Sequence, residues 1–120
     1  MRRAAAILTA IGMVIFPASV RAQDWEVVRT QGMNKLILIP KAKERNYSVY
    51  EDAIRRLCPA DLHCFLHFWS ERRSIPAGFL SEMSDAQENA RLATYIQNPK
   101  TGVRELVYHC RIKFDPNYCR

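Results

Sequence analysis

The sequence predicts a small α+β protein, in which a mixed β-sheet carries two helices and is reinforced by two disulfides. Three observations lead to this fold class. Strand-like segments alternate with segments whose apolar residues have helical spacing. A hairpin pattern opens the folded part, which favours a mixed sheet over a purely parallel one. Four cysteines lie in a chain of only 120 residues. The expected order of elements is β-β-α-β-α-β.

The first 22 residues are typical of a cleavable secretory signal peptide. Two arginines near the start precede an apolar run over residues 4–16, which is too short to span a bilayer comfortably as an anchor. Residues 20–22 offer side chains that a signal peptidase accepts before Gln23. An uncleaved anchoring helix is the alternative, but no stop-transfer pattern follows. We therefore expect residues 23–120 to form one globular domain, periplasmic or secreted, with no integral membrane segment.

The mature part is mildly basic. The whole chain has 18 Lys and Arg against 12 Asp and Glu, a net charge of +6. Three of the arginines belong to the signal peptide, so 15 basic residues stand against 12 acidic ones after cleavage and the net charge is +3. The excess is spread along the chain without a dense block. This distribution fits an envelope protein or an acidic ligand as the partner, and it argues against nucleic acid.

The four cysteines, Cys58, Cys64, Cys110 and Cys119, all lie in the mature part. An even number in a short exported chain indicates two disulfides. We favour the local pairs Cys58–Cys64 and Cys110–Cys119, although longer pairings would stabilise the fold by about 4 kcal/mol each, against roughly 2–3 kcal/mol for the local ones. Zinc is the competing use of four cysteines, but neither pair has the close spacing of a zinc ribbon. We expect no metal and no cofactor.

The first half of the mature chain predicts a hairpin and a helix. Residues 25–39 contain a weakly alternating segment, a turn around Gly32 and a second, more apolar segment, which is the pattern of a hairpin. Ser48 with Glu51 three residues later is a capping-box signal. Apolar residues at helical spacing follow, and we expect a helix of about three turns that ends before Pro59.

The second half predicts a central strand, a helix and a last strand. Residues 63–69 are aromatic on both alternating faces, which is typical of a strand with little room for water on either side. Ser84 with a Gln three residues later is a second capping signal, and a stripe of alanines that ends at Ala93 continues from it. We expect a helix that packs on the sheet and ends at Asn98. Residues 103–112 alternate and predict the last strand, after which the tail is expected to fold back into the core.

Three histidines, His63, His67 and His109, are the candidates for metal or acid–base chemistry. On a strand, His63 and His67 share a face but lie about 13 Å apart, too far to chelate one ion. His109 could join either of them across strands. The sequence contains neither a Gly-x-Ser-x-Gly nucleophile motif nor a glycine-rich phosphate-binding motif. Cys64 beside His63 is expected to be oxidised rather than nucleophilic. A small envelope metal-handling protein or enzyme centred on these histidines is the alternative hypothesis.

The loop after the central strand is the candidate binding site. It begins directly after Trp69 and carries Arg72 and Arg73. Arg and Trp are common in recognition hot spots, and guanidinium groups suit carboxylate or phosphate partners. The alternative is a solvated turn. We therefore hypothesise a non-catalytic exported binding or interaction protein that presents Trp69, Arg72 and Arg73 to a partner. Inhibitors and immunity factors are examples of this class.

Overall fold

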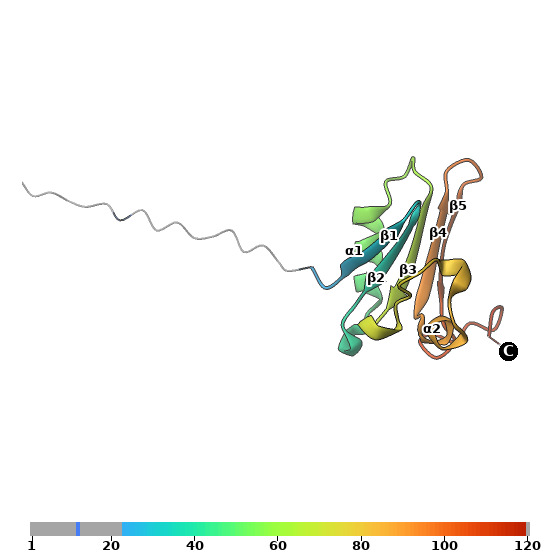
Figure 1. Ribbon diagram of the computed structural model, residues 1–120. Coiled ribbons are helices and arrows are strands. Elements are labelled where there is room, and N and C mark those ends of the chain that lie inside the picture. The colour runs from blue at the N-terminus through green and yellow to red at the C-terminus, as the bar shows by residue number, and fades with distance from the viewer. Residues whose placement is uncertain (1–11, 13–22, 120) are drawn as a thin grey trace, which may run out of the picture.

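The computed structural model describes Gly12 and residues 23–119, so the expected signal peptide, Gly12 aside, lies outside the described residues. Within residues 23–119, five strands form one sheet in the order β1-β2-β3-β4-β5 (Figure 1). Only β2 and β3 pair in parallel, and the other neighbours are antiparallel. This mixed sheet with two helices confirms the predicted α+β fold class. The strands are β1 (Glu26–Gln31), β2 (Asn34–Leu38), β3 (Cys64–Trp69), β4 (Ala93–Asn98) and β5 (Val103–Tyr108).

The helices lie on opposite faces of the sheet (Figure 1). They are α1 (Tyr47–Leu57) and α2 (Asp85–Ala90), and three 3-10 turns accompany them: η1 (Lys41–Lys43), η2 (Arg72–Ser74) and η3 (Leu80–Glu82). The parallel pair β2–β3 needs a crossover connection, and α1 supplies it. The turn between β1 and β2 requires a left-handed residue, and Gly32 provides it with φ of +59°.

The face under α1 holds the larger core. Tyr50 of α1 is fully buried, and its ring lies 5.0 Å from the ring of Phe68 on β3. The Tyr50 hydroxyl donates a hydrogen bond to the carbonyl oxygen of Glu44 at 2.6 Å, so the aromatic side chain buries no unpaired polar group. Val49 and Ala53 complete the buried stripe of the helix. The apolar spacing that predicted this helix therefore corresponds to its packed face.

The opposite face is covered by an irregular segment between β3 and β4, residues 70–91, which we call the excursion. It contains η2, η3 and α2 and folds back over the sheet (Figure 1). Ile75 packs in a small core with Leu36 and Trp69. Gln31 holds the excursion to β1 through two hydrogen bonds, from its Nε2 to the carbonyl oxygen of Gly78 at 2.5 Å and from the Leu80 amide to its Oε1 at 3.3 Å. This cover is thus fixed as much by polar contacts as by apolar burial.

The predicted capping box at Ser48 is wrong. Asn46 is the N-cap of α1, and no side chain caps the helix there. The Ser48 hydroxyl instead donates to Oδ1 of Asn46 at 2.6 Å. The second capping box is present: Ser84 accepts from the Gln87 amide, and the Gln87 side chain accepts from the Ser84 amide.

The prediction that a helix continues from Ser84 to Asn98 is also wrong. The helix ends at Ala90, and β4 occupies Ala93–Asn98, where Ala93 belongs to a strand rather than to a helical stripe. β4 pairs with β3 on one side and with β5 on the other, so pairing on both sides overrides the local helical pattern. The sheet consequently has one strand more than predicted.

The tail after β5 differs from the expectation as well. β5 ends at Tyr108, short of the predicted strand end at residue 112. Ile112 is buried, but Phe114 and Tyr118 are exposed rather than packed in the core. The tail is held by a disulfide between Cys110 and Cys119, and Tyr118 donates a hydrogen bond to Glu105 on β5.

Both predicted disulfides, Cys58–Cys64 and Cys110–Cys119, are confirmed. The first joins the end of α1 to the start of β3, and the second closes the tail. Within the described part of the chain, no cysteine is free. No helix among the described residues is long and apolar enough to cross a membrane.

Candidate functional site

Trp69, the first predicted binding residue, lies inside the protein. Its side chain is fully buried, and its Nε1 donates a hydrogen bond to the carbonyl oxygen of Gln87 at 2.9 Å. The expectation that the Trp69 side chain contacts a partner is therefore wrong, because it has no surface to offer. It anchors the excursion to the sheet instead, since Gln87 belongs to α2.

Arg72 and Arg73 lie at the surface in η2, directly after this anchor. The turn is short and well braced: the amides of Ser74 and Ile75 donate to the carbonyl oxygens of Glu71 and Arg72 at 3.0 and 3.1 Å. Ile75 then inserts into the core beside Trp69. The side chains of Arg72 and Arg73 are 58% and 87% exposed. The structure therefore presents both guanidinium groups on a fixed backbone, which we call the basic loop (residues 70–76).

Each arginine of the basic loop has an exposed carboxylate beside it. Arg72 forms an ion pair with Glu26 at 2.6 Å, and Arg73 forms a longer one with Glu71 at 3.4 Å. Glu71 also accepts from Lys41 at 3.0 Å, and this hydrogen bond and charge, with Arg73 beside them, lower the pKa of Glu71. Solvent-exposed ion pairs of this kind stabilise a fold by only about 0–1 kcal/mol. A carboxylate on a partner can therefore replace the internal one at small cost.

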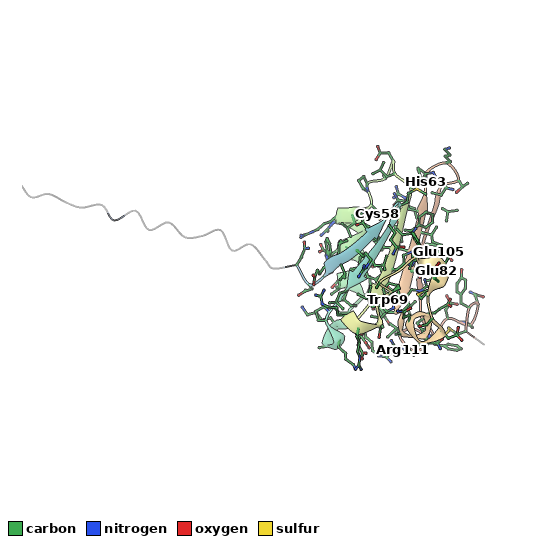
Figure 2. The ribbon with its side chains drawn as sticks, viewed as in Figure 1. Cys58, His63, Trp69, Glu82, Glu105 and Arg111 are labelled. Carbon is green, nitrogen blue, oxygen red and sulfur yellow. A yellow bond between two sulfur atoms is a disulfide. The ribbon has the colours of Figure 1, made fainter. Side chains whose placement is uncertain are left out.

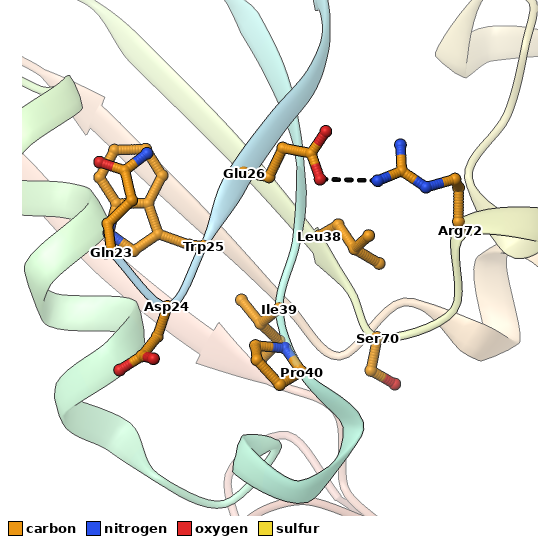
Figure 3. A pocket seen from close by; sticks show the side chains of 9 residues that line it. All are labelled: Gln23, Asp24, Trp25, Glu26, Leu38, Ile39, Pro40, Ser70 and Arg72. Carbon is orange, nitrogen blue, oxygen red and sulfur yellow. Dashed lines mark hydrogen bonds and ion pairs between the residues drawn. The ribbon is translucent and has the colours of Figure 1, made fainter. Parts of the chain in front are cut away.

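A shallow cavity of about 380 Å³ adjoins the basic loop (Figure 3). Leu38 and Ile39 from the end of β2 contribute apolar walls, and Ser70 and Arg72 belong to the loop. The Arg72–Glu26 ion pair crosses one side of this cavity, as Figure 3 shows. The arrangement combines an apolar surface with a guanidinium group at its rim, which is a common composition of protein recognition sites.

The three histidines do not form one site. His63 precedes β3 and lies at the opposite end of the sheet from Trp69 and Arg111 (Figure 2). His67 is buried, with Nε2 2.9 Å from Oδ1 of Asn34 and Nδ1 3.2 Å from a guanidinium nitrogen of Arg91. Both ring nitrogens of His67 are thus engaged. In the described part of the chain, no three His, Cys, Asp or Glu side chains come together as a metal-binding group.

His67 is held neutral by its surroundings. Burial, with the neighbouring Arg91 charge as a second cause, lowers the pKa of His67 to about 4. Because Asn34 Oδ1 can only accept, the proton of the neutral ring is assigned to Nε2, and Nδ1 accepts from Arg91. The sequence does not predict this contact of His67 with Asn34 and Arg91. The pairing of His67 with Thr94, which brings Arg91 close to the histidine, depends on β4, where the sequence predicts a helix.

Comparison with protein-family models, curated proteins and solved structures finds no match for this chain.

Proposed function

We propose that this chain is an exported, non-catalytic binding protein that uses the basic loop to bind an acidic partner in the cell envelope or outside the cell. The observation that carries the proposal is the fixed presentation of Arg72 and Arg73 between a buried tryptophan and a buried isoleucine. A loop that is already ordered loses little conformational entropy on binding. Guanidinium groups on such a loop suit carboxylates of a partner protein or polymer.

Export is supported by two features that differ in kind. The leader has the composition of a signal peptide. The two disulfides are of the type that persists in oxidising compartments. Together they favour the periplasm or the extracellular space as the place where the partner is found.

The test compares two double variants, each of which lacks two arginines that are neighbours in the sequence. Purified protein with both disulfides formed is immobilised, envelope extract of the host is passed over it, and the bound proteins are quantified by mass spectrometry. For the double variant Arg72→Ala/Arg73→Ala, we expect the amount of specifically bound partner to fall about tenfold or more. The reason is that the loss of charge-assisted contacts costs about 1.5–3 kcal/mol of binding free energy. The melting temperature of this variant should stay unchanged because the exposed ion pairs stabilise little.

The matched control is Arg55→Ala/Arg56→Ala on α1. These two arginines are also adjacent, are 76% and 51% exposed, and also pair with a carboxylate, that of Asp52. The control should retain the partner. Equal capture by wild type and by the Arg72/Arg73 variant, or equal loss in both variants, would remove the basic loop from the proposed function.

A further inference from the structure

We propose that a second site, a cavity between the end of α2 and the strands β4 and β5, binds a carboxylate group. The cavity has a volume of about 300 Å³, which is at the lower end of the range for small-molecule sites. It shares no residue with the basic loop, so either proposal can fail without the other. The residues that matter for its chemistry are Glu88, Asn89, Arg91, Thr94 and His109.

Arg91 supplies the positive charge of this cavity, and it is unusually well supported. Its side chain is only 24% exposed. One guanidinium nitrogen lies 3.2 Å from Nδ1 of His67, and His67 is itself held by Asn34 at 2.9 Å. The neutral ring of His67 accepts from the guanidinium without cancelling its charge. One buried and one half-buried polar side chain thus orient a cation toward a cavity, whereas an arginine that only keeps a protein soluble needs no such support.

The charge of Arg91 is only weakly balanced inside the protein. The nearest carboxylate, that of Glu88, lies 3.6 Å from Nη2, which is longer than a hydrogen bond. Glu88 is itself 59% exposed, so water screens much of this interaction. A ligand carboxylate that approached the guanidinium to about 2.8 Å would form charge-assisted hydrogen bonds that Glu88 does not form. Glu88 is therefore a competitor of the ligand at the rim of the site.

Further donors in the cavity match the same ligand. Nδ1 of His109 accepts from the Arg111 amide at 3.2 Å, so Nε2 is assigned as the donor nitrogen of this ring. Among the hydrogen bonds of residues 23–119, none uses this Nε2 or the Thr94 hydroxyl. A guanidinium fork with two additional donors suits the planar, two-oxygen acceptor of a carboxylate. The apolar side chain of Val107 lines the same cavity and offers a contact surface for a small apolar group of the ligand.

The experiment is an NMR titration of the isotope-labelled full domain with both disulfides intact. The probe is N-acetylalanine, and its amide, which lacks the carboxylate, is the matched negative probe. We expect saturable shifts of the Arg91 Nε–H and of the backbone amides of Thr94 and His109 with the acid only. N-acetylglutamate amide distinguishes a side-chain carboxylate from a chain terminus, and inorganic phosphate distinguishes a carboxylate from a phosphate. Tighter binding of phosphate than of either carboxylate would contradict the assignment.

Three variants test whether the binding depends on Arg91 and Glu88. Arg91→Lys retains the charge but removes the fork, and it should weaken binding about tenfold, the factor that corresponds to the loss of roughly 1.4 kcal/mol. Glu88→Gln changes an exposed side chain and removes the competitor, so it should strengthen binding severalfold, a direction that a purely structural role of Arg91 does not produce. Arg104→Gln, on β5 outside the cavity, should leave binding unchanged.

Arg91→Lys also changes a side chain that supports His67. If Arg91→Lys does not fold for this reason, Glu88→Gln decides the outcome. Equal shifts with N-acetylalanine and its amide, or the same affinity in wild type and Glu88→Gln, would overturn the proposal.

Discussion

The two faces of the sheet are covered in different ways. On one face, α1 packs a regular apolar stripe onto the strands, and the core there extends over most of the sheet. On the other face, the excursion covers a small cluster whose buried apolar side chains, in the described residues, are Leu36, Trp69 and Ile75. Partly buried apolar side chains pack around this cluster, and polar contacts, among them the hydrogen bonds of Gln31 and Trp69, attach the excursion further. Both arginines of the basic loop and the carboxylate-binding cavity involve this second cover.

This contrast separates stability from recognition. Apolar burial contributes most of the folding free energy and needs no particular partner geometry, so a regular helix serves it well. Recognition of a charged group needs polar side chains held at fixed positions near water. The excursion provides such positions because its turns and short helix are braced by polar contacts with the sheet. We therefore expect the α1 face to dominate stability and the excursion face to dominate binding.

The largest expected effect on stability comes from the core under α1. Replacing the fully buried Phe68 by Ala should lower the free energy of unfolding by about 4 kcal/mol, because a large aromatic side chain is removed from a closely packed core. Ile75→Ala on the excursion face should cost about 2 kcal/mol, since its smaller cluster can collapse more easily. Chemical denaturation of both variants measures the difference. A larger cost for Ile75→Ala would reverse the proposed contrast between the faces.

The next effect is a pH dependence that originates on the excursion face. The pKa of His67 is about 4 in the folded protein, against about 6.5 in the unfolded chain. Between these values the unfolded state binds a proton that the native state does not, so the free energy of unfolding decreases as the pH falls from 6.5 to 4. The contribution is fully present above pH 6.5, and about 3 kcal/mol of it should be lost by pH 4.

Denaturation at a series of pH values tests this prediction with two variants. His67→Asn removes the titrating ring and should flatten the slope between pH 6.5 and 4. His63→Gln, at the far end of β3, should leave the slope in place. A slope that survives in His67→Asn would show that another group causes it.

A smaller effect is expected at the capping box of α2. Ser84→Ala removes the side chain that accepts from the Gln87 amide, and such caps are worth about 1 kcal/mol. Because α2 has only six residues, the loss should appear as faster amide hydrogen exchange in α2 and at Trp69 Nε1, which donates to Gln87. Exchange in α1 should change only by the global shift in stability. Uniform acceleration throughout the sheet would mean that the excursion does not open separately.

The parts of the fold that the sequence predicts correctly are those determined by local chemistry. The hairpin follows from a turn around Gly32, and α1 follows from its apolar spacing. The local cysteine pairs were preferred over longer ones, and the structure confirms them. Each of these features involves residues close together in the chain, so a single sequence contains the relevant signal.

The features that the sequence did not predict depend on contacts between distant segments. Residues 91–98 follow a genuine helix start at Ser84, and the alanine at position 93 fits a helical stripe, yet the chain there pairs with β3 and β5. The alternation of Ala93, Tyr95 and Gln97 on the buried face was the available strand signal. Because the sequence does not predict β4, it does not predict the contact between Arg91 and His67 either. The burial of Trp69 could not be predicted because residue type alone does not distinguish an exposed tryptophan from a buried one.

The functional account depends most directly on export into an oxidising compartment. Intact-mass spectrometry of the protein isolated from its native host, with iodoacetamide added before any reductant, tests this in one measurement. The account predicts a chain that begins at Gln23, carries no alkylated cysteine and gains four alkyl groups only after reduction. A chain that begins at Met1 and carries four alkylated cysteines without reduction would contradict it.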